Sequence, residues 1–214
     1  FTSRVFGTFV MEGAAMLDEG IPAAVIENAA MQVGMPVGPL AVIDETSLSL
    51  SVHVTEQTRA DFAAEGKAYE VRPGEALIEK MVKDLKRPGR AAGAGFYDYP
   101  AGQKKHLWAG LKAFEKSGVA WDLQTLKDRI LFRQAVETAR CLHEGVLTTV
   151  HDGNVGSIFG IGFPAWTGGA LQFIYSQGVD AFARRCAKLA ADCGPRFALD
   201  DAVLATLRQH QPVY

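Results

Sequence analysis

The sequence predicts an all-α fold made of two tandem copies of one helical unit. Apolar residues recur at three- and four-residue spacing in most of its long segments, which is the period of an amphipathic helix, and the period-two alternation of strands is almost absent. The chain also repeats itself, because a shift of 125 positions places similar residues on one another. The coinciding pairs are Arg4 with Arg129, Val5 with Ile130, Glu12 with Glu137, Leu17 with Leu142, Glu19 with Glu144 and Gly20 with Gly145.

The repeat divides the chain into two predicted domains. With three more residues in the second copy, the motif Gly34-Met35-Pro36 falls on Gly162-Phe163-Pro164. Each copy is then about a hundred residues long, which is the size of a small domain. We therefore predict a first domain over residues 1–100 and a second over residues 101–214.

In the first copy, glycine and proline mark where helices stop and start. Gly20 follows an amphipathic segment as a C-cap, and Pro22 suits the first turn of the next helix. A turn then follows at residues 34–38. The predicted helices are Arg4–Leu17, Ala23–Val33, one long helix from Pro39 to Phe62, and Glu75–Leu85, with a loop over Gly66–Gly74.

A segment rich in proline and glycine, Lys86–Pro100, has the composition of a connector between the copies. Helical spacing returns beyond it. The predicted helices of the second copy are Gln103–Phe114, Leu126–Glu144, Ala170–Ser176, Val179–Ala190 and Asp200–Arg208.

The second copy also holds the most unusual stretch of the chain, Asp152–Gly169 (DGNVGSIFGIGFPAWTGG). Six of its eighteen residues are glycine, a density that lets a backbone take positive φ and pass close to another surface. Its aromatic residues Phe159, Phe163 and Trp166 would anchor it. We predict a glycine-rich turn here.

Composition excludes several classes of function. The net charge is −2 and no block of basic residues occurs, so the electrostatic footprint of a nucleic-acid-binding protein is missing. The three cysteines lack CxxC spacing, which favours reduced thiols in a cytoplasmic compartment and no metal site. No signal peptide or membrane-spanning apolar run is evident. The chain begins FTSRVFGTF, without an initiator methionine and inside a predicted helix, so we expect a fragment.

Two glycine pairs resemble nucleotide-binding loops at first sight. They are Gly93-Ala94-Gly95 and Gly160-Ile161-Gly162. A dinucleotide fingerprint requires a third glycine, a preceding strand and an acidic residue about twenty positions later, and neither pair meets this. Tight backbone packing is the better interpretation, and we expect no cofactor-binding residues in this chain.

No residue set amounts to a complete active site. His151-Asp152 is an imidazole–carboxylate pair, but adjacent residues seldom face each other, and we interpret it as a surface loop. Glu12 and Glu137 lie mid-helix at equivalent points of the repeat. Their repetition favours a shared structural salt bridge or hydrogen bond, with a role as a base left as the alternative. We predict no catalytic residue in the chain.

Four segments together resemble a known family. They are TSRVFGTFVMEGAAMLDEG, GMPVGPLAVIDE, GRAAGAGFYDY and NVGSIFGIGFPAWTGG. They resemble the C-terminal half of the α subunit of the multifunctional fatty-acid β-oxidation enzyme, which is its L-3-hydroxyacyl-CoA dehydrogenase part. The resemblance extends to the closing aromatic Tyr214. It implies two tandem helical domains of the 6-phosphogluconate dehydrogenase C-terminal-like type.

The resemblance also implies what would lie elsewhere. In this family an enoyl-CoA hydratase domain and an NAD-binding Rossmann domain precede the region, and the catalytic His and its Glu partner belong to the Rossmann domain. The whole enzyme oxidises L-3-hydroxyacyl-CoA to 3-ketoacyl-CoA with NAD⁺ and associates with a thiolase β subunit. We therefore expect NAD outside this chain and the chain alone to be inactive.

Two positions match residues that contact the acyl-CoA substrate in the family. Ser3 stands where relatives often have Asn and some have Thr, so it keeps a donor and an acceptor with shorter reach. Phe159 stands where some bacterial relatives have Tyr, and it lacks the hydroxyl. The alternative for Ser3 is a helix N-cap, and for Phe159 it is core packing.

Two rival functions follow from the same residues. In one, the helical copies form an assembly module that docks a thiolase partner, and Ser3 and Phe159 are structural. In the other, the chain belongs to a different enzyme of the 6-phosphogluconate-dehydrogenase-like group, whose upstream domain would not be a hydratase.

Overall fold

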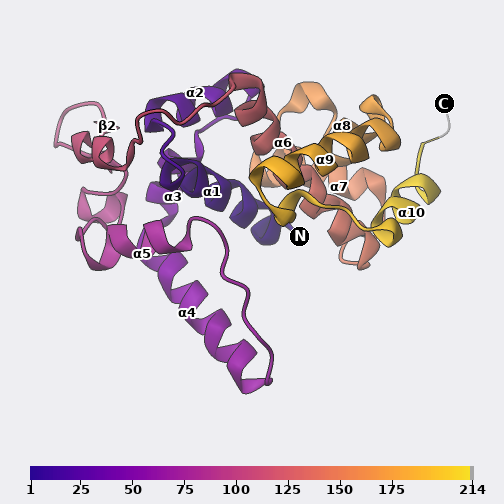
Figure 1. Ribbon diagram of the computed structural model, residues 1–214, viewed down its shortest axis with the longest axis horizontal. Coiled ribbons are helices and arrows are strands. Elements are labelled where there is room, and N and C mark those ends of the chain that lie inside the picture. Colours follow the sequence, from indigo (N-terminus) through magenta and orange to yellow (C-terminus); the bar gives the residue numbers. More distant parts are fainter. Residues whose placement is uncertain (213–214) are drawn as a thin grey trace. The chain divides into compact units, whose positions relative to one another are not determined.

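The computed structural model describes residues 1–212, so Tyr214 lies outside the described residues (Figure 1). Its regular secondary structure is almost entirely helical, which confirms the predicted all-α class. The ten α-helices are α1 Thr2–Asp18, α2 Ala23–Val33, α3 Pro39–Thr46, α4 Leu48–Ala64, α5 Glu75–Lys83, α6 Leu123–His143, α7 Val150–Ile161, α8 Ala170–Gln177, α9 Val179–Cys193 and α10 Asp201–Gln209. The two strands, β1 Tyr97–Asp98 and β2 His106–Leu107, pair antiparallel, and the 3₁₀ helices are η1 Arg90–Ala92, η2 Ala109–Phe114, η3 Ala165–Thr167 and η4 Pro195–Phe197.

The internal repeat is visible in the order of the helices. Helices α1–α5 and α6–α10 follow one another with similar lengths, and α3 and α8 both have 8 residues while α5 and α10 both have 9. The turns after α3 and after α8 also correspond, because Ser47 and Gly178 both have φ of 81°. The boundary at residue 100 stays a prediction.

The chain forms two compact units that do not coincide with the two copies. The α6–α10 unit contains the second copy from Asp122 onward together with Phe1–Phe9 and Ala29–Pro36. The α3–α5 unit contains Val10–Asn28 and Val37–Trp121. The start of α1 and the end of α2 therefore belong with the helices of the second copy. No described helix is both long enough and apolar enough to cross a membrane.

Within the α3–α5 unit, α4 projects as an arm and the segment after it returns along its length (Figure 1). Arg72 holds this segment against α4 and α5. Its guanidinium hydrogen-bonds the hydroxyl of Thr55 at 3.1 Å and pairs with the buried carboxylate of Glu75 at 2.5 Å. The predicted loop over Gly66–Gly74 is confirmed.

The single helix predicted from Pro39 to Phe62 is wrong. The chain breaks at Ser47, whose positive φ is unusual for a residue other than glycine. The break is compensated by hydrogen bonds: the Ser47 hydroxyl accepts the N–H of Leu50 at 3.4 Å, and the N–H of Leu48 donates to the carbonyl of Pro88 at 3.0 Å. The apolar spacing runs through this break, so it did not reveal the change of direction.

The glycine-rich turn predicted at Asp152–Gly169 is also wrong over its first half. Residues 150–161 form α7, and positive φ begins only at Gly162. The helical glycines serve close packing instead: a Cβ at Gly153 would lie 2.7 Å from Cδ1 of Leu171. The predicted helix Gln103–Phe114 is likewise replaced by β2 and the 3₁₀ helix η2.

The connector predicted at Lys86–Pro100 is pinned to α3 by one buried carboxylate. Asp44, 1% exposed, accepts the backbone N–H groups of Phe96 and Tyr97, both at 2.8 Å, and the hydroxyl of Tyr99 at 3.1 Å. Burial raises the pKa of Asp44, although these donors partly offset it. The segment is therefore part of the core of its unit, with Phe96 fully buried.

We predict that Asp44→Asn lowers the free energy of unfolding by about 1–3 kcal/mol, because an amide NH₂ would face a backbone N–H that needs an acceptor. Urea unfolding followed by circular dichroism measures this loss. Tyr99→Phe is the matched control, since it removes one donor and leaves both backbone bonds in place. An Asp44→Asn protein no less stable than Tyr99→Phe would contradict this role.

Candidate functional site

Ser3 lies in the first turn of α1, and it is exposed. The helix begins at Thr2, and the carbonyl oxygen of Phe1 already accepts the N–H of Val5 at 3.0 Å. Ser3 is thus inside the helix, and its interpretation as the N-cap is wrong. Its role in binding substrate stays a prediction.

Phe159 lies near the C-terminal end of α7 and is 85% exposed. The alternative of core packing is therefore wrong. Val155, one helical turn earlier, is 41% exposed, so α7 presents two large apolar side chains on the surface. Such neighbouring apolar groups are typical of binding surfaces.

Two glycines of α7 lie at its contact with the start of α1. A Cβ at Gly160 would lie 2.8 Å from Cγ2 of Thr2, and a Cβ at Gly156 would lie 3.0 Å from the ring of Phe1. The start of α1 therefore rests directly on the backbone of α7. Ser3 follows Thr2 and Phe159 precedes Gly160, so both predicted substrate residues flank one helix contact.

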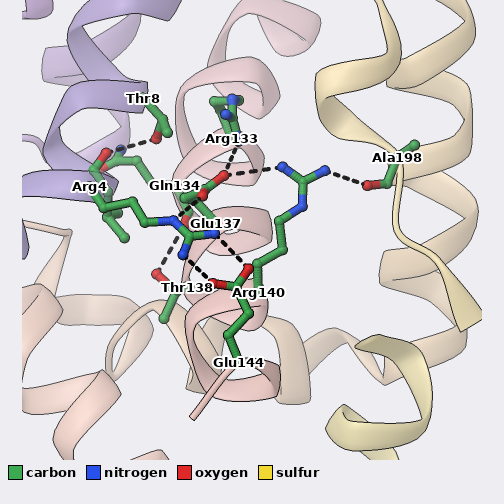
Figure 2. A network of polar contacts seen from close by, with 10 residues as sticks. Arg4, Thr8, Arg133, Gln134, Glu137, Thr138, Arg140, Glu144 and Ala198 are labelled. Atoms are coloured by element: carbon green, nitrogen blue, oxygen red, sulfur yellow. Dashed lines mark hydrogen bonds and ion pairs between the residues drawn. The ribbon is translucent and has the colours of Figure 1, made fainter. Parts of the chain in front are cut away.

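The first turn of α1 is held on α6 by a network of ion pairs centred on Glu137 (Figure 2). Its carboxylate, 8% exposed, lies 2.5 Å from Nε of Arg4, 3.0 Å from Nη1 of Arg133 and 3.1 Å from Nη1 of Arg140. Burial opposes its ionisation, but Arg133 and Arg4 outweigh burial and lower the pKa of Glu137. The structural salt bridge predicted for Glu137 is confirmed.

Glu144, at the C-terminal end of α6, also binds Arg4. One of its oxygens accepts Nη2 of Arg4 at 2.8 Å and the other pairs with Nη1, so the carboxylate binds the guanidinium with two bonds (Figure 2). The hydrogen bond to Arg4 lowers the pKa of Glu144. In the sequence, Glu144 stands out only because the repeat aligns it with Glu19, and this does not reveal its bond to Arg4. Glu12 is 2% exposed, and its structural role stays a prediction.

His151 and Asp152 lie in the first turn of α7, so the surface-loop interpretation is wrong. The Thr149 hydroxyl accepts the N–H of Asp152 at 3.0 Å and donates to its carboxylate at 2.8 Å. This reciprocal arrangement is a helix cap.

The glycine pairs do not fit a bound dinucleotide. A Cβ at Gly95 would lie 2.1 Å from a carboxylate oxygen of Asp44, and a negative charge there opposes a pyrophosphate. Gly160 lies at the contact with α1, and a Cβ at Gly162 would lie 2.7 Å from Cγ of Pro36. These three glycines are explained by close packing, and Gly93 by its φ of 75°. Residues 1–212 also contain no group of three His, Cys, Asp or Glu that could hold a metal ion.

Comparison with known proteins places this geometry in a family context. Residues 1–99 match the family described as 3-hydroxyacyl-CoA dehydrogenase, C-terminal domain. The fatty acid oxidation complex subunit alpha of Shewanella sp. strain ANA-3 is 30% identical over 206 residues, which cover 92% of this chain and 28% of that protein. The subunit from Shewanella baltica strain OS155 is 29% identical over 201 residues. The chain thus spans little more than a quarter of these relatives, and the resemblance inferred from its motifs is confirmed.

Two solved structures share the fold. The dehydrogenase part of multifunctional enzyme 1 from C. elegans has a TM-score of 0.68 and 22% identity, over 95% of this chain and 46% of that one. The 3-hydroxybutyryl-CoA dehydrogenase of Escherichia coli K12 has a TM-score of 0.68 and 16% identity, over 97% of this chain and 59% of that one. At these identities the likeness establishes the helical fold.

We predict that Glu137→Gln weakens folding in a pH-dependent way. Because the pKa of Glu137 is lowered from its ordinary value of 4.5, its ion pairs stabilise the protein above pH 4.5, and that stabilisation disappears as the pH falls through the lowered pKa. The variant should therefore lose about 1–3 kcal/mol near pH 7 and converge with the wild type in acid. Urea unfolding between pH 3 and 7 measures the difference. A difference that stays constant over this range would contradict the assignment.

Proposed function

We propose that this chain is the substrate-side part of an NAD-dependent L-3-hydroxyacyl-CoA dehydrogenase within a multifunctional fatty-acid β-oxidation enzyme. The match of residues 1–99 to the C-terminal domain of 3-hydroxyacyl-CoA dehydrogenases carries this proposal. The reaction is the oxidation of 3-hydroxyacyl-CoA to 3-ketoacyl-CoA. The chain would contribute one wall of the acyl-CoA site and no catalytic base.

The residues assigned to the wall are Ser3 and Phe159. Ser3 offers an exposed hydroxyl that can donate to an oxygen at the reacting end of the substrate. Phe159 offers an exposed ring on which the acyl-CoA can pack. Their chain neighbours Thr2 and Gly160 are in contact, and the ion pairs of Arg4 hold the turn that carries Ser3.

The remaining parts of the enzyme would lie on other domains. We propose that an upstream Rossmann domain holds NAD and the catalytic His and Glu, because the glycine pairs of this chain do not fit a dinucleotide. The relatives are named as alpha subunits of a fatty acid oxidation complex, which fits a larger assembly. We propose an upstream enoyl-CoA hydratase domain and a thiolase β subunit as partner, as the family resemblance implies. The absence of CxxC spacing among the three cysteines fits a cytoplasmic location.

The direct test measures NADH formation from L-3-hydroxybutyryl-CoA by the full-length protein that contains this chain and by residues 1–214 alone. We expect activity in the full-length protein and none in the shorter form. A folded full-length protein that oxidises neither short nor long 3-hydroxyacyl-CoA would refute the dehydrogenase function.

An assembly module is the second candidate, and the exposed Trp166 favours it. This side chain is 70% exposed, while its indole N–H is held by the carbonyl oxygen of Val33 at 2.7 Å. A rigidly held, exposed Trp is typical of protein interfaces. Pull-down of a thiolase subunit separates the candidates: an assembly role predicts that changes at Ser3 and Phe159 leave the kinetics unchanged and weaken association.

We predict that Ser3→Ala in the full-length enzyme lowers kcat/KM about three- to tenfold, the effect of one lost hydrogen bond between neutral groups. Ser3→Thr, which keeps the hydroxyl, should stay close to the wild type.

Phe159→Ala should raise KM for acyl-CoA, and Trp121→Ala, a change at another exposed aromatic, is its control. Steady-state NADH kinetics measure all four variants. Equal kinetics for Ser3→Ala and Ser3→Thr would remove Ser3 from the site.

A further inference from the structure

Gly7 is a glycine inside α1 that neither backbone conformation nor packing explains. Its φ is not positive. Apart from its chain neighbours and the adjacent backbone of α1, no described heavy atom lies within 4 Å of the place where a Cβ would be. Gly13 on the same helix is different, because a Cβ there would lie 2.5 Å from Cβ of Pro39. A glycine within a helix is less favourable than alanine, so folding alone does not account for Gly7.

The second copy shows what normally fills this position. The shift of 125 residues places Gly7 on Phe132, which is buried in α6. The Phe132 ring is stacked on Phe182 of α9 at 4.7 Å between ring centroids and meets Phe173 of α8 edge-on at 5.3 Å. An aromatic cluster therefore covers this face of α6.

The neighbouring position on the same face is also closed in the second copy. Ser3 corresponds to Asp128, whose carboxylate accepts Nε of Arg185 on α9 at 2.6 Å. In the first copy, Ser3 is exposed and one helical turn from Gly7, so the two share a face of α1. In the second copy, aromatic rings and an ion pair cover this face of α6. In the first copy, the equivalent face of α1 carries the hydroxyl of Ser3 and, at Gly7, no side chain.

Exposed apolar residues of α7 lie near the start of the same helix. The contact of Thr2 with Gly160 places α7 next to the first turn of α1, where Phe159 is 85% and Val155 is 41% exposed. A hydroxyl, one helix position without a side chain and exposed apolar groups suit a ligand that has a polar head and an apolar chain.

We infer that Gly7 is a specificity-determining residue that leaves room for the acyl chain of a long-chain 3-hydroxyacyl-CoA. This inference rests on the proposed function. Ser3 faces the oxygen-bearing end of the substrate, and the chain beyond it passes over Gly7. A large side chain at this position would fill the space on α1 that is equivalent to the one that Phe132 fills on α6.

The test uses Gly7→Phe in the full-length enzyme, with four-carbon and sixteen-carbon L-3-hydroxyacyl-CoA as substrates. The ratio of kcat/KM for the long over the short substrate should fall about tenfold or more, since losing the space for part of an apolar chain discriminates by at least this factor. Ala187→Phe, which adds the same ring at an exposed position of α9, should keep the wild-type ratio. Thermal unfolding of both variants checks that they fold.

The outcomes are distinct. A folded Gly7→Phe enzyme with the wild-type ratio, or with equal losses on both substrates, overturns the inference. If Gly7→Phe does not fold, Gly7→Leu is measured by the same ratio and decides in the same way. A wild-type enzyme that oxidises neither substrate refutes the proposed function itself, whereas an active wild type with an unaffected variant refutes only the role of Gly7.

Discussion

The geometry of the candidate site depends on the carboxylate of Glu137 being held among three arginines. A charge this deeply buried is stable only while its partners remain in place, so the pairs with Arg4, Arg133 and Arg140 constrain one another. Arg4 is the member that reaches from α1, and Glu144 binds it from a second side. The position of the whole first turn of α1, and with it Ser3, follows from this network.

The sequence predicted the elements whose causes are local. Ala23–Val33 agrees with α2 at both ends, because a proline precedes it and a glycine of positive φ follows. The break at Ser47 could not be predicted, since its φ is sustained by the carbonyl of Pro88, 41 positions away. Helix α7 was missed for the same reason: its glycines look like turn residues until the neighbours Leu171, Thr2 and Phe1 explain them.

The candidate site was predictable only in part. Family motifs pointed to Ser3 and Phe159, but their surroundings had to come from the structure, because helix boundaries and exposure decide between the alternatives. The repeat pointed to Glu137 as a structural residue. Its partners Arg133 and Arg140 stand at helical spacing on α6, but its third partner, Arg4, comes from α1 and no spacing rule connects it. Pairing across 133 positions is a tertiary property, which amphipathic periodicity does not encode.

With the role proposed for Gly7, the duplication would divide structural and binding functions between the two copies. In the second copy, large side chains on α6, α8 and α9 pack into one aromatic cluster, and Phe132, Phe173 and Phe182 contact one another in pairs. Each such ring stabilises the fold through burial, and each also removes space from the surface of α6. The first copy has Gly7 in place of the first of these rings and keeps that surface of α1 open. Two copies of one helical unit can therefore have different roles. A large side chain at this position stabilises the fold, whereas a glycine leaves space that a substrate can occupy.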